Sequence, residues 1–167
     1  WIKYLMMDVE RPRVIVLFSG SGRTIENLAG LVAEGNLQVD IVLAISSSSK
    51  AGGIARARKY AIPVEVIDPK TFADVRTYDV AVWRKIREIS PRLVVLAGYI
   101  HLLSIPADYR FKVMNIHPAL LPGFGGKGYY GHHVHQAVLA AGVGESGCTV
   151  HFADAGYDAG PIVLQRK

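Results

Sequence analysis

The chain has 167 residues, of which 50% are hydrophobic, enough for one domain with a sizeable core. Its net charge of +5 comes from scattered Lys and Arg residues, which excludes the concentrated basic stripe of a nucleic-acid-binding surface and suits a small anionic substrate. No apolar run reaches about 18 residues, so no membrane-spanning helix is expected. The single cysteine, Cys148, cannot form an internal disulfide, which favours a cytoplasmic protein with this side chain buried.

Strands and helices alternate in the predicted secondary structure. In chain order the sequence predicts a strand at 14–18, a helix ending at Gly35-Asn36, a strand at 41–45, a helix at 53–60, a strand at 64–67, a helix stopping at Ser90-Pro91, strands at 93–97 and 113–116, a loop at 118–132, a helix at 133–141, and strands at 149–152 and 162–165. The first, second and fourth strands are unbroken apolar runs, typical of a parallel sheet covered on both faces. Thr71-Phe72-Ala73-Asp74 resembles a capping box that opens the third helix. We expect one doubly wound, mostly parallel α/β domain at 13–167, preceded by an extension at 1–12.

The most informative polar residues are Asn115 and His117, in Asn115-Ile116-His117-Pro118, and the remote Asp158. His117 follows a buried strand and precedes a glycine-rich loop, so it lies at the carboxyl end of a strand, where α/β proteins bind ligands. Imidazole can move a proton at neutral pH, the Asn amide can donate to a developing oxyanion, and the carboxylate can orient the imidazole. These groups suffice for an acyl transfer. The alternative is a structural His that only ties down loop carbonyls.

A glycine-rich turn at 19–24 follows the first strand and opens the first helix. Backbone amides and the positive end of the helix converge there, which makes the turn a candidate phosphate site. A dinucleotide site would need a glycine at position 25 and an acidic residue after the second strand, but Ile25 and the serines at 46–49 occupy these places. NAD is therefore disfavoured. A tight turn without a ligand is the alternative.

The loop at 120–131 contains five glycines and three aromatic residues. We expect a mobile segment that covers a substrate, with a surface excursion as the alternative. His132, His133 and His135 raise the alternative of a zinc site, but the last two would point to different faces of a helix, and no metal is expected. His151 alternates with apolar neighbours and is interpreted as a half-buried strand residue.

Five segments, taken together and in this order, resemble the glycinamide ribonucleotide formyltransferase family. They are Ser19-Gly20-Ser21-Gly22, Leu96-Ala97-Gly98-Tyr99, Asn115-Ile116-His117-Pro118-Ala119-Leu120-Leu121-Pro122, Thr149-Val150-His151-Phe152 and Asp158-Ala159-Gly160-Pro161-Ile162. The resemblance implies a Rossmann-like formyltransferase fold. It also implies transfer of a formyl group from 10-formyltetrahydrofolate to the amine of 5-phosphoribosylglycinamide, a step of purine (IMP) biosynthesis. The implied partners are these two small molecules, without a metal, and a homodimer is left open.

The resemblance also assigns roles to individual residues. The catalytic trio would be Asn115, His117 and Asp158, and the substrate phosphate would bind Gly22, Arg23 and Thr24. The folate site would comprise Arg76, Ile100, His101, Leu102, Leu103, Asn115, Asp154, Ala155, Gly156, Tyr157 and Asp158. Two positions depart from the family pattern: His101 stands where an arginine is common, and Arg76 lies one place from the usual arginine. The sequence ends at Lys167, before a family tail that contacts the substrate.

Two other functions stay open on the residues alone. A formyltetrahydrofolate deformylase would use the same trio with water as the acceptor, but that family usually has a His-Ser pair where this chain has Pro118-Ala119. A non-catalytic nucleotide-binding module would use only the glycine turn, and the intact trio argues against it. We therefore expect a formyl transferase that acts on a phosphorylated amine.

Overall fold

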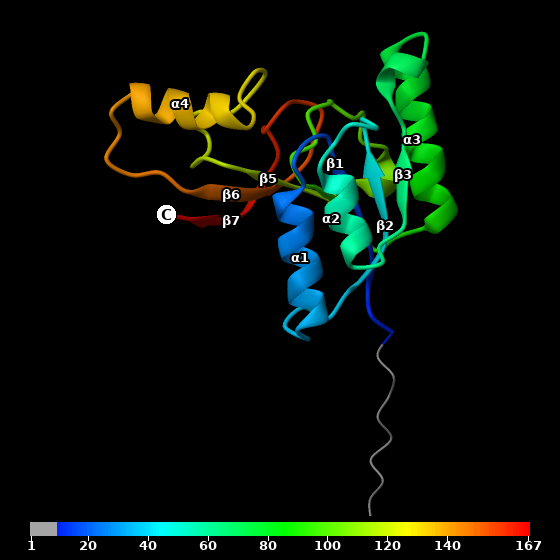
Figure 1. Cartoon of the computed structure of the whole chain (residues 1–167). Helices are drawn as coiled ribbons and strands as arrows, with labels where there is room; N and C mark the ends of the chain where they lie inside the picture. Colours follow the sequence, from blue (N-terminus) through cyan, green and yellow to red (C-terminus); the bar gives the residue numbers. More distant parts are fainter. Residues whose placement is uncertain (1–9) are drawn as a thin grey trace, which may run out of the picture.

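A seven-stranded sheet in the order β3-β2-β1-β4-β5-β6-β7 forms the centre of the computed structural model, which describes residues 10–167 (Figure 1). The strands are β1 (Arg13–Phe18), β2 (Asp40–Ser46), β3 (Val64–Val66), β4 (Leu93–Leu96), β5 (Val113–His117), β6 (Cys148–Phe152) and β7 (Ile162–Arg166). The helices are α1 (Arg23–Ala33), α2 (Gly53–Lys59), α3 (Val75–Ile89) and α4 (His132–Ala140), with short 3-10 helices at Pro69–Thr71 and Ala107–Tyr109. Strands β1 to β5 are parallel, whereas β6 and β7 are antiparallel to their neighbours. The predicted doubly wound, mostly parallel α/β fold is confirmed.

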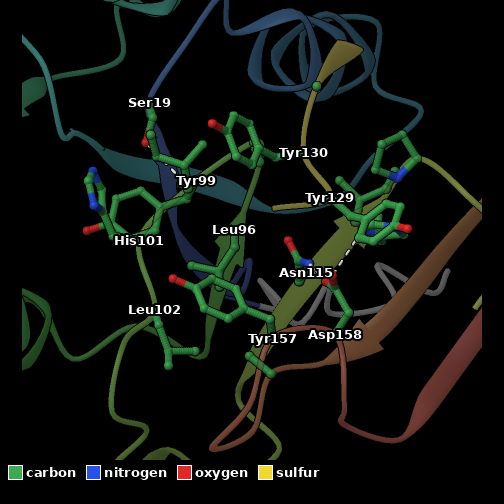
Figure 2. A pocket seen from close by; sticks show the side chains of 18 of the residues that line it. Ser19, Leu96, Tyr99, His101, Leu102, Asn115, Tyr129, Tyr130, Tyr157 and Asp158 are labelled. Carbon is green, nitrogen blue, oxygen red and sulfur yellow. Dashed lines mark hydrogen bonds and ion pairs between the residues drawn. The ribbon is translucent and has the colours of Figure 1, made fainter. Parts of the chain in front are cut away.

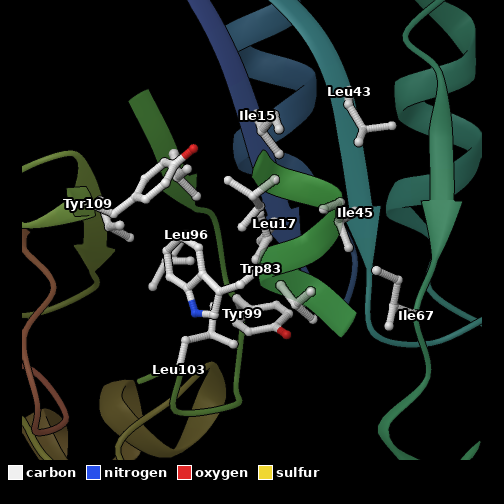
Figure 3. Packing of buried hydrophobic residues seen from close by; sticks show 14 of the residues in the cluster. Ile15, Leu17, Leu43, Ile45, Ile67, Trp83, Leu96, Tyr99, Leu103 and Tyr109 are labelled. Carbon is white, nitrogen blue, oxygen red and sulfur yellow. The ribbon is translucent and has the colours of Figure 1, made fainter. Parts of the chain in front are cut away.

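Strand β1 shows how an unbroken apolar run serves both faces of the sheet. Residues 14–18 are all buried, and successive side chains point to opposite faces. Every second residue, starting with Val14, packs toward α1 and α2. Ile15 and Leu17 belong to the cluster on the α3 side, which Figure 3 shows with Trp83. Because helices cover both faces, no position of this stretch can be polar without burying an unpaired group.

Helix α3 begins later than the sequence predicts. Its cap is Asp74, whose carboxylate accepts a hydrogen bond from the Thr77 amide at 2.7 Å, while the Asp74 amide donates to the Thr77 hydroxyl at 3.3 Å. The predicted capping box at 71–74 is therefore wrong in position. The Thr71 hydroxyl instead donates to the Asp68 carbonyl at 2.8 Å, at the end of the preceding 3-10 helix.

The strand order reverses between β1 and β4. From β1 the chain continues to β2 and β3 toward one edge of the sheet, and it then returns to β4 and β5 on the other side of β1. The loops that leave the carboxyl ends of β1 and β4 therefore run apart, which opens the crevice where such sheets bind ligands. Ser19 and Gly98 follow these two strands, and the Ser19 amide donates to the Gly98 carbonyl at 3.1 Å.

Beyond β5 the sheet becomes antiparallel, and this change of direction completes the site. Pairing of β5 with β6 sets Asn115 opposite His151. Strand β7 closes the sheet as an exposed edge strand.

Between residues 10 and 167, no helix is both long and apolar enough to cross a membrane. Residues 1–9 of the extension predicted at 1–12 lie outside the described residues. The domain boundaries stay a prediction.

Candidate active site

A pocket of about 810 Å³ lies at the carboxyl ends of β1, β4 and β5 (Figure 2). Most of the predicted site residues line it, namely Gly22, Arg23, Thr24, Ile100, His101, Leu102, Leu103, Asn115, His117, Asp154, Gly156, Tyr157 and Asp158. Arg76, on the exposed first turn of α3, and Ala155 are not part of this lining. One cavity thus contains the glycine turn, the two segments assigned to folate and the trio. The individual roles of these residues stay predictions.

The glycine turn leaves the start of α1 without a side-chain cap. Gly22 is the cap residue, and its φ of 74° is left-handed, a conformation that favours glycine. The first amides of the helix therefore keep their hydrogens as donors at its positive end. Glu26 in the same turn pairs with Arg56, which compensates its charge. With the exposed Arg23 beside these amides, this end of the pocket suits an anion.

His117 and Asp158 face each other inside the pocket wall. His117 is 2% exposed, and its Nδ1 lies 3.4 Å from Asp158 Oδ2. The other ring nitrogen, Nε2, lies 2.7 Å from the carbonyl oxygen of Phe124, an atom that can only accept a hydrogen bond. Nε2 therefore donates to Phe124. The predicted pair of His117 and Asp158 is present, and the second nitrogen of the imidazole is engaged by the loop that follows β5.

Two acceptors hold the Asn115 amide. Its Nδ2 donates to Asp158 Oδ1 at 3.1 Å and lies 3.0 Å from His151 Nε2. Because a carboxylate only accepts, the Asn115 atom facing Asp158 has to be the nitrogen. His151 Nδ1 donates to the Phe152 carbonyl at 2.9 Å, which leaves Nε2 as an acceptor for the second amide hydrogen. Both hydrogens of the Asn115 side chain thus have partners.

His151 is part of this network, which corrects its interpretation as a half-buried strand residue. It is 1% exposed and also lies, through Nε2, 3.3 Å from Asp158 Oδ1. Alternation with apolar neighbours indicates a strand, but it cannot reveal which residue the adjacent strand sets opposite. The only signal available in the sequence was the resemblance, whose fourth segment contains His151.

Asp158 has an unusual backbone and a stabilised charge. Its φ of 53° lies in the left-handed region that residues other than glycine rarely adopt. Burial alone would raise the pKa of this carboxyl, but the bond that a protonated His151 ring can donate, the bond from the Gly126 amide and the charge that His117 can carry lower it below the ordinary 3.8. The Gly126 amide donates to Oδ2 at 3.0 Å. Asp158 is therefore ionised at neutral pH.

The loop at 118–131 closes one side of the trio. Gly125 lies so near Asp158 that an added Cβ would be 3.3 Å from the Asp158 Cβ. Tyr129 and Tyr130 extend the loop's contribution to the pocket (Figure 2). The predicted covering segment thus borders the site, and its mobility stays a prediction.

The segment at 100–103 forms an apolar wall of the pocket. Ile100 is 44% exposed and Leu102 37% exposed, whereas Leu103 is buried. The next amide, that of Ser104, donates to Asp79 Oδ2 at 3.0 Å, and Asp79 is buried on α3. The wall is therefore fixed to the helix behind it and can present apolar side chains to a flat ligand.

His101, at the position where the family commonly has arginine, packs against two tyrosine rings. Its ring meets those of Tyr78 and Tyr99 edge to face, with centroids 5.7 Å and 5.4 Å away. Burial lowers the pKa of His101, against the attraction of the Asp68 charge. The position therefore offers a neutral aromatic ring where an arginine would offer a charge.

Several pocket residues were missed by sequence reasoning. Tyr99 and His135 line the pocket without having been assigned to it, and Ser19, the first residue of the predicted phosphate turn, had no role assigned to its side chain. Cys148 is half-buried at the pocket, which corrects the prediction of interior packing and follows from its place at the start of β6. Within residues 10–167 no group of three or more His, Cys, Asp or Glu side chains is placed to hold a metal ion.

The doubly wound sheet, the uncapped glycine turn and the network of Asn115, His117, His151 and Asp158 define an α/β protein that can hold an anionic small molecule beside acid–base groups. Residues 12–167 match the family described as formyl transferase. The chain belongs to the formyl transferase family, as the sequence resemblance predicts.

Relatives of known name cover most of this chain. It is 35% identical over 157 residues to phosphoribosylglycinamide formyltransferase of Haemophilus influenzae, which covers 93% of this chain and 72% of that protein. It is 37% identical over 167 residues to the chloroplastic phosphoribosylglycinamide formyltransferase of Vigna unguiculata, covering 96% of this chain. The chain spans 52% of the length of that relative.

A solved structure supports the same fold. Glycinamide ribonucleotide transformylase 1 from Symbiobacterium toebii matches with a TM-score of 0.86 and 34% sequence identity. The match covers 95% of this chain and 73% of that one.

Proposed function

We propose that this chain transfers a formyl group from 10-formyltetrahydrofolate to the amine of 5-phosphoribosylglycinamide, a step of purine biosynthesis. The observation that carries the proposal is one cavity of about 810 Å³ that joins the uncapped turn at α1 to Asn115, His117 and Asp158. The names of the relatives from Haemophilus influenzae and Vigna unguiculata support the same reaction.

The glycine turn would hold the phosphate of the acceptor. Its uncapped amides at the positive end of α1 match an anion, and the Arg23 guanidinium can add a charge-assisted bond. Binding energy from a phosphate remote from the reacting amine can orient that amine against the formyl carbon. Water carries no phosphate, so a hydrolase would gain nothing from this turn.

The trio supplies what the bond change requires. Attack of the amine on the formyl carbon puts negative charge on the formyl oxygen and obliges the amine nitrogen to give up one proton; the bond from the formyl carbon to folate then breaks, and the departing folate nitrogen takes up a proton. His117 can hold and deliver that proton, directly or through a water molecule, and the ionised Asp158 at 3.4 Å stabilises the positive charge on its ring. An amide hydrogen of Asn115 can meet the charge on the oxygen. No covalent bond to the protein is needed.

Two contacts have to change before these groups meet the reactants. His117 Nε2 is engaged by the Phe124 carbonyl at 2.7 Å, so the loop has to shift to release it. Both Asn115 hydrogens have acceptors, so the formyl oxygen has to replace one of them. Such exchanges of hydrogen bonds cost little net energy, about 1 kcal/mol each.

The folate would lie between the segments at 100–103 and 154–158, which line the pocket except for Ala155. Ile100 and Leu102 offer apolar contact to a flat heterocycle, and the backbone of these segments offers hydrogen bonds. His101 would contribute stacking in place of the charge of an arginine.

The test measures loss of the formyl group from 10-formyltetrahydrofolate with and without 5-phosphoribosylglycinamide. We expect consumption to depend on the acceptor and the formylated acceptor to appear in equal amount. The matched control is the same acceptor without its phosphate, which we expect to show a KM at least about tenfold higher. Consumption at the same rate with and without acceptor would refute the proposal and favour the hydrolase.

A further inference from the structure

Ser19 is the first residue of the turn predicted to bind phosphate, and its side chain has no role in the assignments above. It follows β1 directly, opens the glycine turn and lines the pocket (Figure 2). Its backbone amide is committed to the Gly98 carbonyl at 3.1 Å. The side chain is half-buried, so the orientation of its hydroxyl is decided by its neighbours.

Two donors use the lone pairs of the Ser19 hydroxyl. The Ile100 amide donates to Oγ at 3.2 Å, and the Ser47 hydroxyl donates to it at 2.7 Å. The reverse direction for the second bond would leave the Ser47 proton without an acceptor, because the described residues offer this hydroxyl no other partner. Ser47 is only 4% exposed, and an unpaired buried donor is costly. Ser47 therefore donates.

A hydroxyl has one proton and two lone pairs, so with both lone pairs occupied the Ser19 proton is left to donate. Within residues 10–167 it has no acceptor, and its residue borders the pocket. The bonds from Ile100 and Ser47 fix the oxygen in place. The pocket thus contains a donor that is oriented before any ligand arrives.

We propose that the Ser19 hydroxyl is a specificity-determining donor to an oxygen atom of the phosphorylated acceptor, on its phosphate or its ribose. The inference rests on the proposed function, because it takes the same acceptor. Ser19 is continuous with the turn that would hold the phosphate, and the Gly53 amide fixes this turn by donating to the Gly20 carbonyl at 3.1 Å. On the side assigned to folate, Ser19 is already engaged, because its oxygen accepts the hydrogen bond of the Ile100 amide.

The experiment compares Ser19→Ala with Ser47→Ala in steady-state kinetics and in calorimetric binding of the acceptor without folate. Ser19→Ala should raise the KM and Kd for the acceptor about tenfold, with the KM for folate changed less than about twofold. Ser47→Ala is the matched control, because it removes the bond between the two serines but leaves Ser19 its proton. It should raise the KM for the acceptor less than Ser19→Ala does, because the proton stays while one of the two bonds that hold its oxygen is lost, and it should leave the KM for folate within about twofold of wild type. Ser19→Thr retains the hydroxyl and should restore acceptor binding.

The KM pattern separates this role from a purely structural one. If Ser19 only supported the loop at Ile100, Ser19→Ala would raise the KM for folate instead, and the proposal would be overturned. It would equally be overturned if Ser47→Ala copied Ser19→Ala, or if acceptor binding were unchanged. A wild-type protein that binds the acceptor but transfers no formyl group would refute the proposed function while the calorimetric comparison still decides the role of Ser19.

Discussion

Replacing Gly22 with alanine would place a Cβ against the backbone of Gly53, with the Gly53 nitrogen at 3.2 Å and the Cα nearer still. The φ of 74° adds a cost, because a left-handed conformation disfavours residues with a Cβ by about 1–2 kcal/mol. Either the turn moves away from α2 or the helix cap distorts. In both cases the amides at the start of α1 lose their common direction.

We expect Gly22→Ala to lower the free energy of unfolding by at least about 1–2 kcal/mol, or roughly 2–8 °C in Tm for a domain of this size. Charge-assisted bonds to phosphate are worth about 1.5–3 kcal/mol, so the KM for the acceptor should rise about 10-fold to 100-fold. Thermal unfolding and acceptor titrations measure the two effects.

The same turn supplies a matched control. A Cβ at Gly20 would meet nothing within 4 Å, and its φ is not in the left-handed region. Gly20→Ala should therefore change stability by less than about 0.5 kcal/mol. Equal behaviour of the two variants would refute the steric argument, and unchanged acceptor binding in Gly22→Ala would refute the assignment of the turn to phosphate.

Three further predictions concern the trio and its neighbour. His117→Ala should lower kcat about 100-fold to 10,000-fold in protein that still folds, and a near wild-type rate would make the imidazole structural. Asp158 has a lowered pKa, so its stabilising contribution is present above the ordinary 3.8 and is lost as pH falls through the folded value. The difference in unfolding free energy between wild type and Asp158→Asn should thus shrink below about pH 4 in denaturant titrations, and a constant difference would contradict the assigned pKa direction. His151→Leu leaves an Asn115 hydrogen without its acceptor and should cost about 1–3 kcal/mol of stability and lower kcat, whereas unchanged values would place His151 outside the network.

Features set by neighbouring residues could be predicted from the sequence. The run at 14–18 predicts a buried strand because helices cover both of its faces, which leaves no position for a polar side chain. The place of His117 at the end of β5 followed from the apolar residues before it and the glycines after it. The cap of α3 was misplaced because Thr71 and Asp74 are both good capping residues, and only the 3-10 turn at Asp68 decides between them.

Features set by pairing across the sheet could not be predicted in this way. His151 reaches Asn115 because β6 is antiparallel to β5 with that register, and one residue of slip would turn its side chain to the other face. Ser19 meets Ile100 and Ser47 because β1 lies between β4 and β2, whose following residues converge at the same edge of the sheet. Neither contact leaves a pattern along the chain.

The contact between His117 and the Phe124 carbonyl has a consequence for chemical fidelity. With Nδ1 facing Asp158 and Nε2 donating to the loop, the imidazole offers no nitrogen that could deprotonate water. A bound formyl donor would then be shielded from hydrolysis as long as the loop stays in place. If displacement of the loop accompanies binding of the phosphorylated amine, His117 becomes free to exchange a proton only when that amine is beside it.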